Sequence, residues 1–234
     1  AMMRRMGHRL AELAWPEVAP LLDAGATPVL PVGAAAKVHG AHLPMETDFL
    51  TAEALGRRLA ERADVLVWPT LGYGHYPAFR AYAGSTSTPE PAFEGTVLAL
   101  LEDLARAART PPLVRTTGVS TIRAIDGACR EHGAARAVHV YRGARYAEIA
   151  AELLEQPRGG HADEAETSVM LHLCPERVRM ARAATWVEEV RAGVWSPSDP
   201  GSPSYAPLGL YGDATRATPE KGARLVAAML EHLC

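Results

Sequence analysis

The residues best suited to chemistry gather in the segment from position 33 to 48, which reads GAAAKVHGAHLPMETD. His39 and His42 lie three positions apart, and Asp48 follows nine positions after His39. Imidazole and carboxylate groups are suitable ligands for zinc, manganese or iron. A loop lets side chains at this spacing converge on one ion. The segment therefore predicts a metal site, with the alternative that Asp48 only caps a helix and one histidine binds backbone.

A second group of ionisable residues, His161, Asp163, Glu164 and Glu166, opens a stretch of helical period that stops before Pro175. Carboxylates in the first turn of a helix are favoured by the helix dipole. Asp163 and Glu164 are therefore expected to be solvated charges at a helix N-terminus.

Two further loops contain candidate substrate-binding residues. Tyr73 and His75 lie in a Gly-containing loop, where His75 could contact substrate or replace a ligand. Ser120 and Thr121 follow Gly118 at a predicted strand-to-helix turn, and backbone amides at such a turn can hold an anionic group. A serine nucleophile is not expected, because the GxSxG pattern is absent.

The elements that must position these residues alternate between short apolar runs and stretches of helical period. Continuous apolar runs, as opposed to alternating ones, are typical of a parallel sheet that is covered on both faces. We expect strands at 27–32, 65–69, 113–116 and 137–141, helices at 48–62, 94–108 and 119–132, and a last helix capped by Thr218. Irregular stretches are expected at 72–91 and 195–217. Ligands of such sheets bind at loops leaving the carboxyl ends of strands, where the candidate loops lie.

Composition limits the class of protein. The 234 residues suit one domain, residues 1–234, and the net charge of −3 from mixed acidic and basic residues predicts no nucleic-acid or membrane partner. No apolar stretch is long enough to span a bilayer and no signal peptide is evident, so a cytoplasmic location is expected. Cys129, Cys174 and Cys234 are too few and too scattered for a disulfide framework, and buried thiols are expected.

Four ordered blocks of this sequence resemble the creatininase (creatinine amidohydrolase) family. The first loop resembles the family signature PVGSxEQHGPHLPxxTD, with one extra residue between Gly33 and His39. The other blocks are YGHYPAF with YAGSTS, GGHADEAETSVMLHLCPERV at 159–178, and GLYGDATRATPEKG at 209–222. The resemblance implies an α/β fold of three layers, α/β/α, with a mostly parallel sheet. It also implies a small-molecule substrate and a homo-oligomer.

The resemblance further implies which residues bind metal. In the family the signature Glu, the first His and the Asp bind a pair of divalent metals, with the Asp bridging them. His39 and Asp48 are retained here, but Lys37 replaces the Glu, and TTGVST at 116–121 replaces a motif with another histidine ligand. A protonated lysine cannot coordinate a cation, although an ammonium about 4 Å from a carboxylate supplies about 4 kcal/mol at an effective dielectric near 20. We therefore expect one ion, on His39, Asp48 and Glu166, with His42 as a further candidate.

By the same resemblance, His161 acts in proton transfer near the scissile bond, while Glu166 faces the metal. The expected function is a metal-dependent amidohydrolase that cleaves a non-peptide C–N bond, such as that of a cyclic amide, with a metal-activated water. The alternative is a metal-poor family member that uses Lys37 as a base or Schiff-base amine, or a binding or scaffold subunit.

Overall fold

A parallel five-stranded sheet forms the centre of the protein in the computed structural model, which describes residues 6–188, 190 and 193–231. Its strand order is β1-β3-β2-β4-β5, and every neighbouring pair is parallel. The strands are β1 (His8–Arg9), β2 (Thr27–Val32), β3 (Val65–Val67), β4 (Leu113–Thr116) and β5 (Arg136–His139). Central β2 pairs Val32 with Thr116 of β4, so these two strands end side by side.

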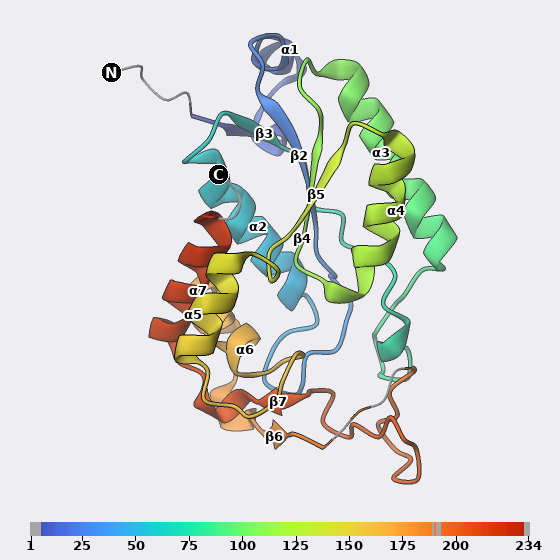
Figure 1. The fold of residues 1–234 in the computed structure, drawn as a ribbon, viewed down its shortest axis with the longest axis vertical. Coiled ribbons are helices and arrows are strands. Elements are labelled where there is room, and N and C mark those ends of the chain that lie inside the picture. The colour runs from blue at the N-terminus through green and yellow to red at the C-terminus, as the bar shows by residue number, and fades with distance from the viewer. Residues whose placement is uncertain (1–5, 189, 191–192, 232–234) are drawn as a thin grey trace.

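Helices cover both faces of this sheet (Figure 1). One face carries α3 (Glu90–Ala107) and α4 (Ile122–His132); the other carries α2 (Thr47–Ala60), α5 (Ala144–Leu153), α6 (Glu164–Leu173) and α7 (Pro219–Glu231), and α1 (Trp15–Asp23) lies at one end. The expected three-layer α/β/α class with a parallel sheet is confirmed.

Several short elements complete the chain. Strands β6 (Thr185–Trp186) and β7 (Gly212–Asp213) form a separate antiparallel pair. Single 3-10 turns are formed by Leu10–Glu12, Pro77–Phe79, Val119–Thr121, Pro175–Arg177, Met180–Arg182 and Ala214–Arg216.

The core explains why β2 reads as a continuous apolar run. Leu30 and Val32 pack toward α3 and α4, whereas Val29 packs with Leu59 of α2 and Val67 of β3. Both faces of the strand are therefore buried, as a sheet between two helical layers requires.

Some element boundaries differ from those expected from the sequence, either because a proline begins a helix or because the element is very short. Helix α3 begins at Glu90 instead of position 94, because Pro91 fits the first turn of a helix. Strands β1 and β6, of two residues each, are too short to show a period, and neither they nor α1 were expected. Thr218 caps α7 as predicted, with its Oγ1 accepting from the Lys221 amide at 3.2 Å.

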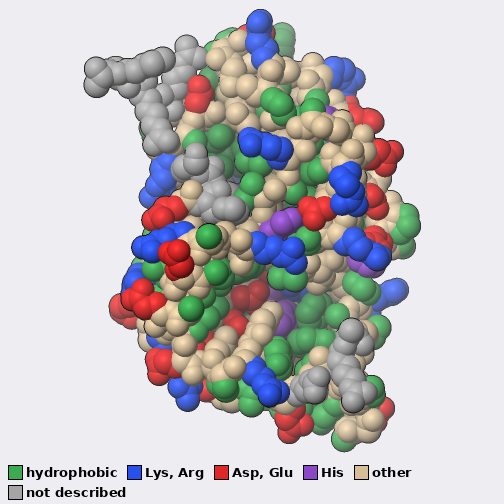
Figure 2. All heavy atoms as spheres, viewed as in Figure 1, with side chains coloured by type: hydrophobic (Ala, Val, Ile, Leu, Met, Phe, Trp, Pro, Cys, Tyr) green, Lys and Arg blue, Asp and Glu red, His purple; other side chains and the backbone are tan. Residues whose placement is uncertain are grey.

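The surface carries charges of both signs, interspersed over the face seen in Figure 2. Among the described residues, no helix has the length and apolar content needed to cross a membrane. The Cys129 thiol is buried as expected, Cys174 is partly buried, and Cys234 lies outside the described residues.

Candidate metal centre

Asp48 lies where loops from the carboxyl ends of neighbouring strands meet. It belongs to the first turn of α2 and is 1% exposed. Thr117, which follows β4, donates its hydroxyl to the Asp48 carbonyl at 2.8 Å. A Cβ at Gly33, the residue after β2, would lie 2.3 Å from that same carbonyl oxygen, so only glycine allows the loop and α2 to approach this closely.

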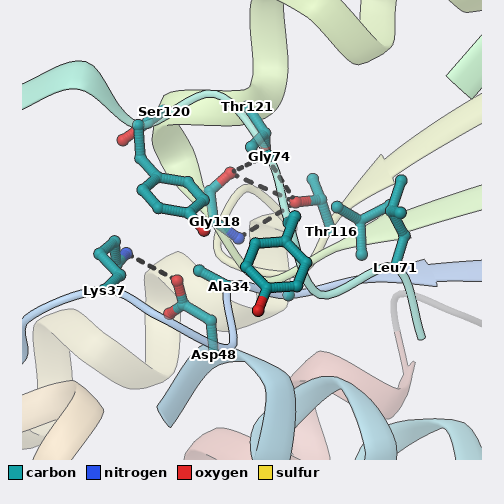
Figure 3. A pocket seen from close by; sticks show the side chains of 13 residues that line it. Ala34, Lys37, Asp48, Leu71, Gly74, Thr116, Gly118, Ser120 and Thr121 are labelled. Atoms are coloured by element: carbon teal, nitrogen blue, oxygen red, sulfur yellow. Dashed lines mark hydrogen bonds and ion pairs between the residues drawn. The ribbon is translucent and has the colours of Figure 1, made fainter. Parts of the chain in front are cut away.

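The buried Asp48 carboxylate binds both Lys37 and His39. Its Oδ2 lies 2.6 Å from the Lys37 ammonium, and its Oδ1 lies 3.1 Å from His39 Nε2. The ion pair with Lys37 is marked in Figure 3. Burial alone would raise the pKa of Asp48, but the charges of Lys37 and His39 lower it below its ordinary value. The carboxylate is therefore ionised and forms an ion pair with the ammonium through Oδ2.

The hydrogen bonds of His39 do not suit a neutral imidazole. Its Nδ1 faces the Lys37 carbonyl at 3.0 Å, while its Nε2 faces Asp48 Oδ1. A neutral ring donates from only one nitrogen, so one of these contacts places two acceptors together. Either a second proton or a bound cation resolves this conflict. Burial and the Lys37 charge lower the pKa of His39, which disfavours the second proton.

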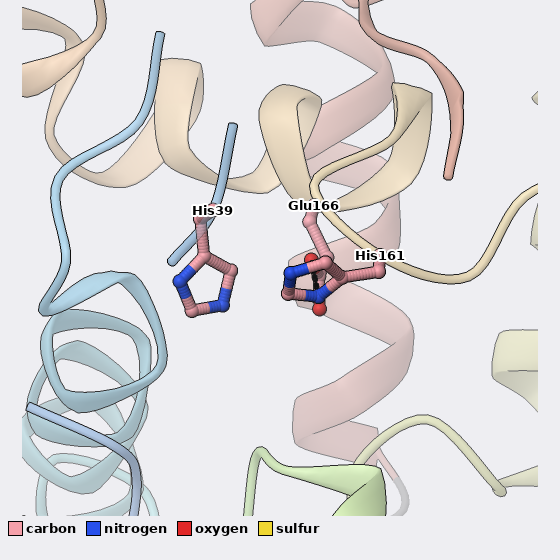
Figure 4. A group of neighbouring side chains, drawn as sticks. All are labelled: His39, His161 and Glu166. Atoms are coloured by element: carbon pink, nitrogen blue, oxygen red, sulfur yellow. Dashed lines mark ion pairs between the residues drawn. The ribbon is translucent and has the colours of Figure 1, made fainter. Parts of the chain in front are cut away.

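His161 and Glu166 reach the same point from the opposite side. Ligand atoms of His39, His161 and Glu166 lie within 4.8 Å of one another, and Figure 4 shows the three side chains facing each other. His161 Nε2 donates to the Val38 carbonyl at 2.8 Å, which leaves a lone pair on Nδ1, 3.9 Å from Glu166 Oε2. The Nδ1 lone pair of His161 and the carboxyl group of Glu166 therefore lie close together on this side of His39.

A strained turn positions these two residues at the start of α6. Ala162 is held at φ 49°, and its amide donates to Glu166 Oε2 at 2.6 Å. Asp163 caps the helix by accepting from the Ala165 and Glu166 amides, each at 3.0 Å. A left-handed alanine is unfavourable, and such strain is characteristic of functional turns.

Electrostatics in the cluster favour a cation. Burial raises the pKa of Glu166 to about 8, and the nearby Asp48 charge contributes to the rise. Burial, with the charges of His39 and Lys37, lowers the pKa of His161 well below its ordinary value. Carboxylates that repel one another and imidazoles that resist protonation both become favourable around a divalent ion. The donor set of this protein therefore fits a divalent metal.

The structure places His42 outside this group. Its Nε2 is hydrogen-bonded to Thr167 Oγ1 at 2.8 Å, and His42 is not among the convergent ligand atoms of His39, His161 and Glu166. Asp48 is also outside that set, but its Oδ1 lies 3.1 Å from His39 Nε2. Gly40, at φ 65°, turns the chain between the two histidines, so that His39 points to Asp48 and His42 points to α6.

Asp163 and Glu164 are not solvated charges, contrary to the sequence expectation. They are 4% and 0% exposed. Besides its capping role, Asp163 accepts from the Gln156 side chain at 2.7 Å, and Glu164 binds Lys221 Nζ at 2.5 Å. Hydrogen bonds and an ion pair thus compensate for the loss of water, and both residues fix the position of α6.

A cavity of about 10 Å³ lies against Lys37 and Asp48. Three predicted substrate-binding residues, Tyr73, Ser120 and Thr121, line it. Thr121 is engaged with Thr116, their hydroxyls being 3.0 Å apart. The buried Tyr76 also lines the cavity, although the sequence did not single it out. Its place in the same loop as Tyr73 and His75 is the one signal that pointed to it.

The fourth predicted substrate-binding residue, His75, lies just outside this cavity, in a surface groove of about 380 Å³. Ser120 lines both spaces. Pro77, Ala78 and Val194 contribute apolar walls, and Arg123 and Glu90, which form an ion pair with each other, contribute charges of both signs.

Aromatic rings cover His161. The Phe79 ring is 4.3 Å from the imidazole and the Trp195 ring is 5.4 Å from it, measured between centroids. The Trp195 amide is anchored to the Ala78 carbonyl at 2.7 Å. These rings exclude water from one side of the site, a role that the sequence did not indicate for them.

A parallel α/β sheet whose strand-end loops bring imidazoles and carboxylates to one point is an arrangement of metal-dependent hydrolases. The chain belongs to the creatininase family, described as creatinine amidohydrolase, which residues 11–234 match. It is 30% identical over 223 residues to the mycofactocin precursor peptide peptidase of Mycobacterium ulcerans (strain Agy99), covering 87% of this chain and 81% of that protein.

Solved creatininase structures share the fold. A manganese creatininase superposes with a TM-score of 0.79 at 25% identity, covering 97% of this chain and 96% of the other. A creatininase variant of the Zn-Zn type gives a TM-score of 0.80 at 25% identity, with 96% and 95% covered. The expected family membership is confirmed.

Proposed function

We propose that this protein is an amidohydrolase that uses one divalent metal ion, held by His39, Asp48 and Glu166. The observation that carries the proposal is the convergence of acceptors: His39 Nε2 lies 3.1 Å from Asp48 Oδ1, and the ligand atoms of His39, His161 and Glu166 lie within 4.8 Å of each other. The solved manganese and zinc creatininases support this choice of metals.

Lys37 supports one ion instead of two. Its ammonium lies 2.6 Å from Asp48 Oδ2, and this fixed positive charge would repel a second cation beside that oxygen. When bound, the single ion would supply Lewis-acid activation of an amide carbonyl and of a water molecule. Lys37 adds a fixed positive charge beside it.

His161 is suited to carry the proton. Its Nε2–H is fixed by the Val38 carbonyl, so the Nδ1 lone pair faces the site. Burial lowers the pKa of His161, so the ring is neutral and its Nδ1 can act as the acceptor for a proton of the attacking water. The protonated ring can then give that proton to the leaving amine. Phe79 and Trp195 shield the imidazole from bulk water during this transfer.

The space around the site favours an extended amide over a small ring. The cavity beside Lys37 and Asp48, at about 10 Å³, holds about one water-sized atom. The remainder of a substrate would extend past Ser120 into the groove beside His75. The relative named as a precursor peptide peptidase supports this choice, so the C–N bond we propose is that of a peptide-like amide.

The ion pair argues against Lys37 as a Schiff-base amine. A nucleophilic lysine must be neutral, whereas this one is 2.6 Å from an ionised, buried carboxylate. The same geometry supports its role as a fixed cation.

Metal analysis tests the proposal. Purified protein should contain about one equivalent of zinc or manganese by mass spectrometry. Saturation of the metal-stripped protein at about 100 times Kd should add about 2.7 kcal/mol and raise Tm by about 5–10 °C. The loaded protein should release a free amine from capped alanine peptides.

The variant His39→Ala should lose both the ion and the rise in Tm. His8→Ala is the matched control, because His8 is exposed on β1 and lies far from the cluster in the sequence. A wild-type protein that binds no stoichiometric metal and is not stabilised by it would refute the proposal.

A further inference from the structure

Tyr76 carries a hydroxyl that the fold buries and leaves without a partner. The side chain is 1% exposed, and its oxygen has no hydrogen bond among the described residues. The Gly74 backbone comes near it without reaching hydrogen-bonding geometry. A buried hydroxyl without a partner is destabilising, and phenylalanine would fill nearly the same volume without this cost. We therefore expect this oxygen to form a hydrogen bond with a bound ligand.

The surroundings of Tyr76 show where that ligand would lie. The residue lines the cavity of about 10 Å³ together with Lys37 and Asp48. Burial raises the pKa of Tyr76 to about 12, and the Asp48 charge contributes to the rise. The phenol thus stays protonated near neutral pH. It can therefore donate a hydrogen bond to an acceptor that enters this space.

Lys37 provides a second donor to the same cavity. Its ammonium forms an ion pair with Asp48 Oδ2 at 2.6 Å, and it lies 5.2 Å from the centroid of the Phe79 ring. Asp48 is its one ion-pair partner among the described residues. Tyr76 and Lys37 both line a space for about one oxygen atom. A phenol and an ammonium that contact the same oxygen form a donor pair for a developing negative charge.

We propose that the Tyr76 hydroxyl and the Lys37 ammonium bind the carbonyl oxygen of the amide substrate and stabilise the oxyanion of the tetrahedral intermediate. This assignment rests on the proposed amide hydrolysis. Water adds to the carbonyl carbon, its proton passes to His161, and the carbonyl π electrons move to the oxygen between Tyr76 and Lys37. Collapse of the intermediate breaks the C–N bond, and His161 returns the proton to the amine.

Tyr76→Phe tests the role, with Tyr82→Phe as the matched control. Tyr82 is another partly buried tyrosine, but its hydroxyl already donates to the Ala206 carbonyl at 2.5 Å. Y76F should lower kcat by about 10²-fold with little change in KM, the usual effect of removing one oxyanion donor, and should not lower Tm. Y82F should lower Tm, because it removes a hydrogen bond that the fold uses.

A binding measurement separates this assignment from the proposed function. Trifluoroacetone is hydrated in water to a small tetrahedral diol, and its binding can be followed by fluorine NMR without turnover. Wild-type protein should bind it about tenfold more tightly than Y76F. If this difference is present but no amide is hydrolysed, the donor pair stands and the proposed function fails. If the protein hydrolyses amides but Y76F and wild type have equal binding and equal kcat, the donor pair alone is overturned. A loss of Tm in Y76F equal to that in Y82F would also overturn it.

Discussion

Position 37 determines how many ions the site can hold. The Lys37–Asp48 pair is nearly dry, with side chains 6% and 1% exposed. Removing one partner of such a pair is costly, since it leaves a buried charge without compensation. The lysine is therefore a structural part of the site as well as a source of charge.

Lys37→Glu should convert the site to one that binds two ions. In the absence of metal, glutamate beside Asp48 places two carboxylates together, and unfolding free energy should fall by about 3–5 kcal/mol. Added zinc should restore it, with about two equivalents bound. Lys37→Met is the control: it loses the ammonium to the same degree but offers no oxygen ligand, so its stoichiometry should stay at one or below. Metal content by mass spectrometry and urea unfolding measure both effects, and an unchanged stoichiometry in K37E would contradict this account of position 37.

At the residue scale, the sequence indicated which side chains could converge but not where each one points. His39 and Asp48 are brought together as their loop predicted, and His161 and Glu166 join them. His42 points away because Gly40 adopts φ 65° between the two histidines, a backbone angle that residue types alone do not reveal. Tyr76 escaped notice for a related reason, since burial of one tyrosine in a loop that contains several depends on tertiary packing.

At the scale of elements, the packing of α7 against α6 holds the metal-facing residues in place. Gly222 of α7 sits where a Cβ would lie 1.9 Å from the Ser168 carbonyl oxygen of α6. Helix α6 also carries Glu166 and is anchored from α7 through the Glu164–Lys221 ion pair. The glycine permits a backbone approach that any larger residue would prevent.

Gly222→Ala should therefore destabilise the protein although alanine is the better helix former. Overpacking should cost about 2–3 kcal/mol of unfolding free energy and move α6 enough to weaken metal binding. Gly95→Ala, in α3, is the matched control, because a Cβ at Gly95 meets nothing within 4 Å. That substitution should add about 0.5–1 kcal/mol. Urea unfolding of both variants tests the contrast, and a neutral G222A would show that the helices can separate freely.

The sequence predicted the main elements well and their exact contacts poorly. Strands β2 and β4 were expected at the residues where they occur, because continuous apolar runs are required between two helical layers. The close approach of the α6 backbone to Gly222 could not be expected. From sequence alone, a glycine inside a helical pattern only indicates a weaker helix, because the neighbouring backbone is not known. The burial of Glu164 likewise depends on Lys221, 57 positions away.

For the molecule as a whole, the unfavourable arrangement of charges in the site should make the free energy of unfolding depend on pH. Burial and the Asp48 charge raise the pKa of Glu166 from 4.5 to about 8. For a carboxyl group whose pKa is raised by folding, the contribution to stability is fully present below pH 4.5 and is lost as the pH rises through about 8. Metal-stripped protein should thus become less stable across this window.

Glu166→Gln should remove this part of the pH dependence, because glutamine carries no charge at any of these pH values. Between about pH 5 and about pH 8, stripped wild-type protein should lose about 2–4 kcal/mol of unfolding free energy relative to E166Q. Glu102→Gln, at an exposed position of α3, is the control and should follow the wild type. Added metal should oppose the loss in wild-type protein, since an ion binds the ionised carboxylate and gains affinity as the pH rises. Parallel pH profiles for stripped wild type and E166Q would mean that Glu166 is not held in a dry, negatively charged site, and the case for a cation at this position would lose its electrostatic support.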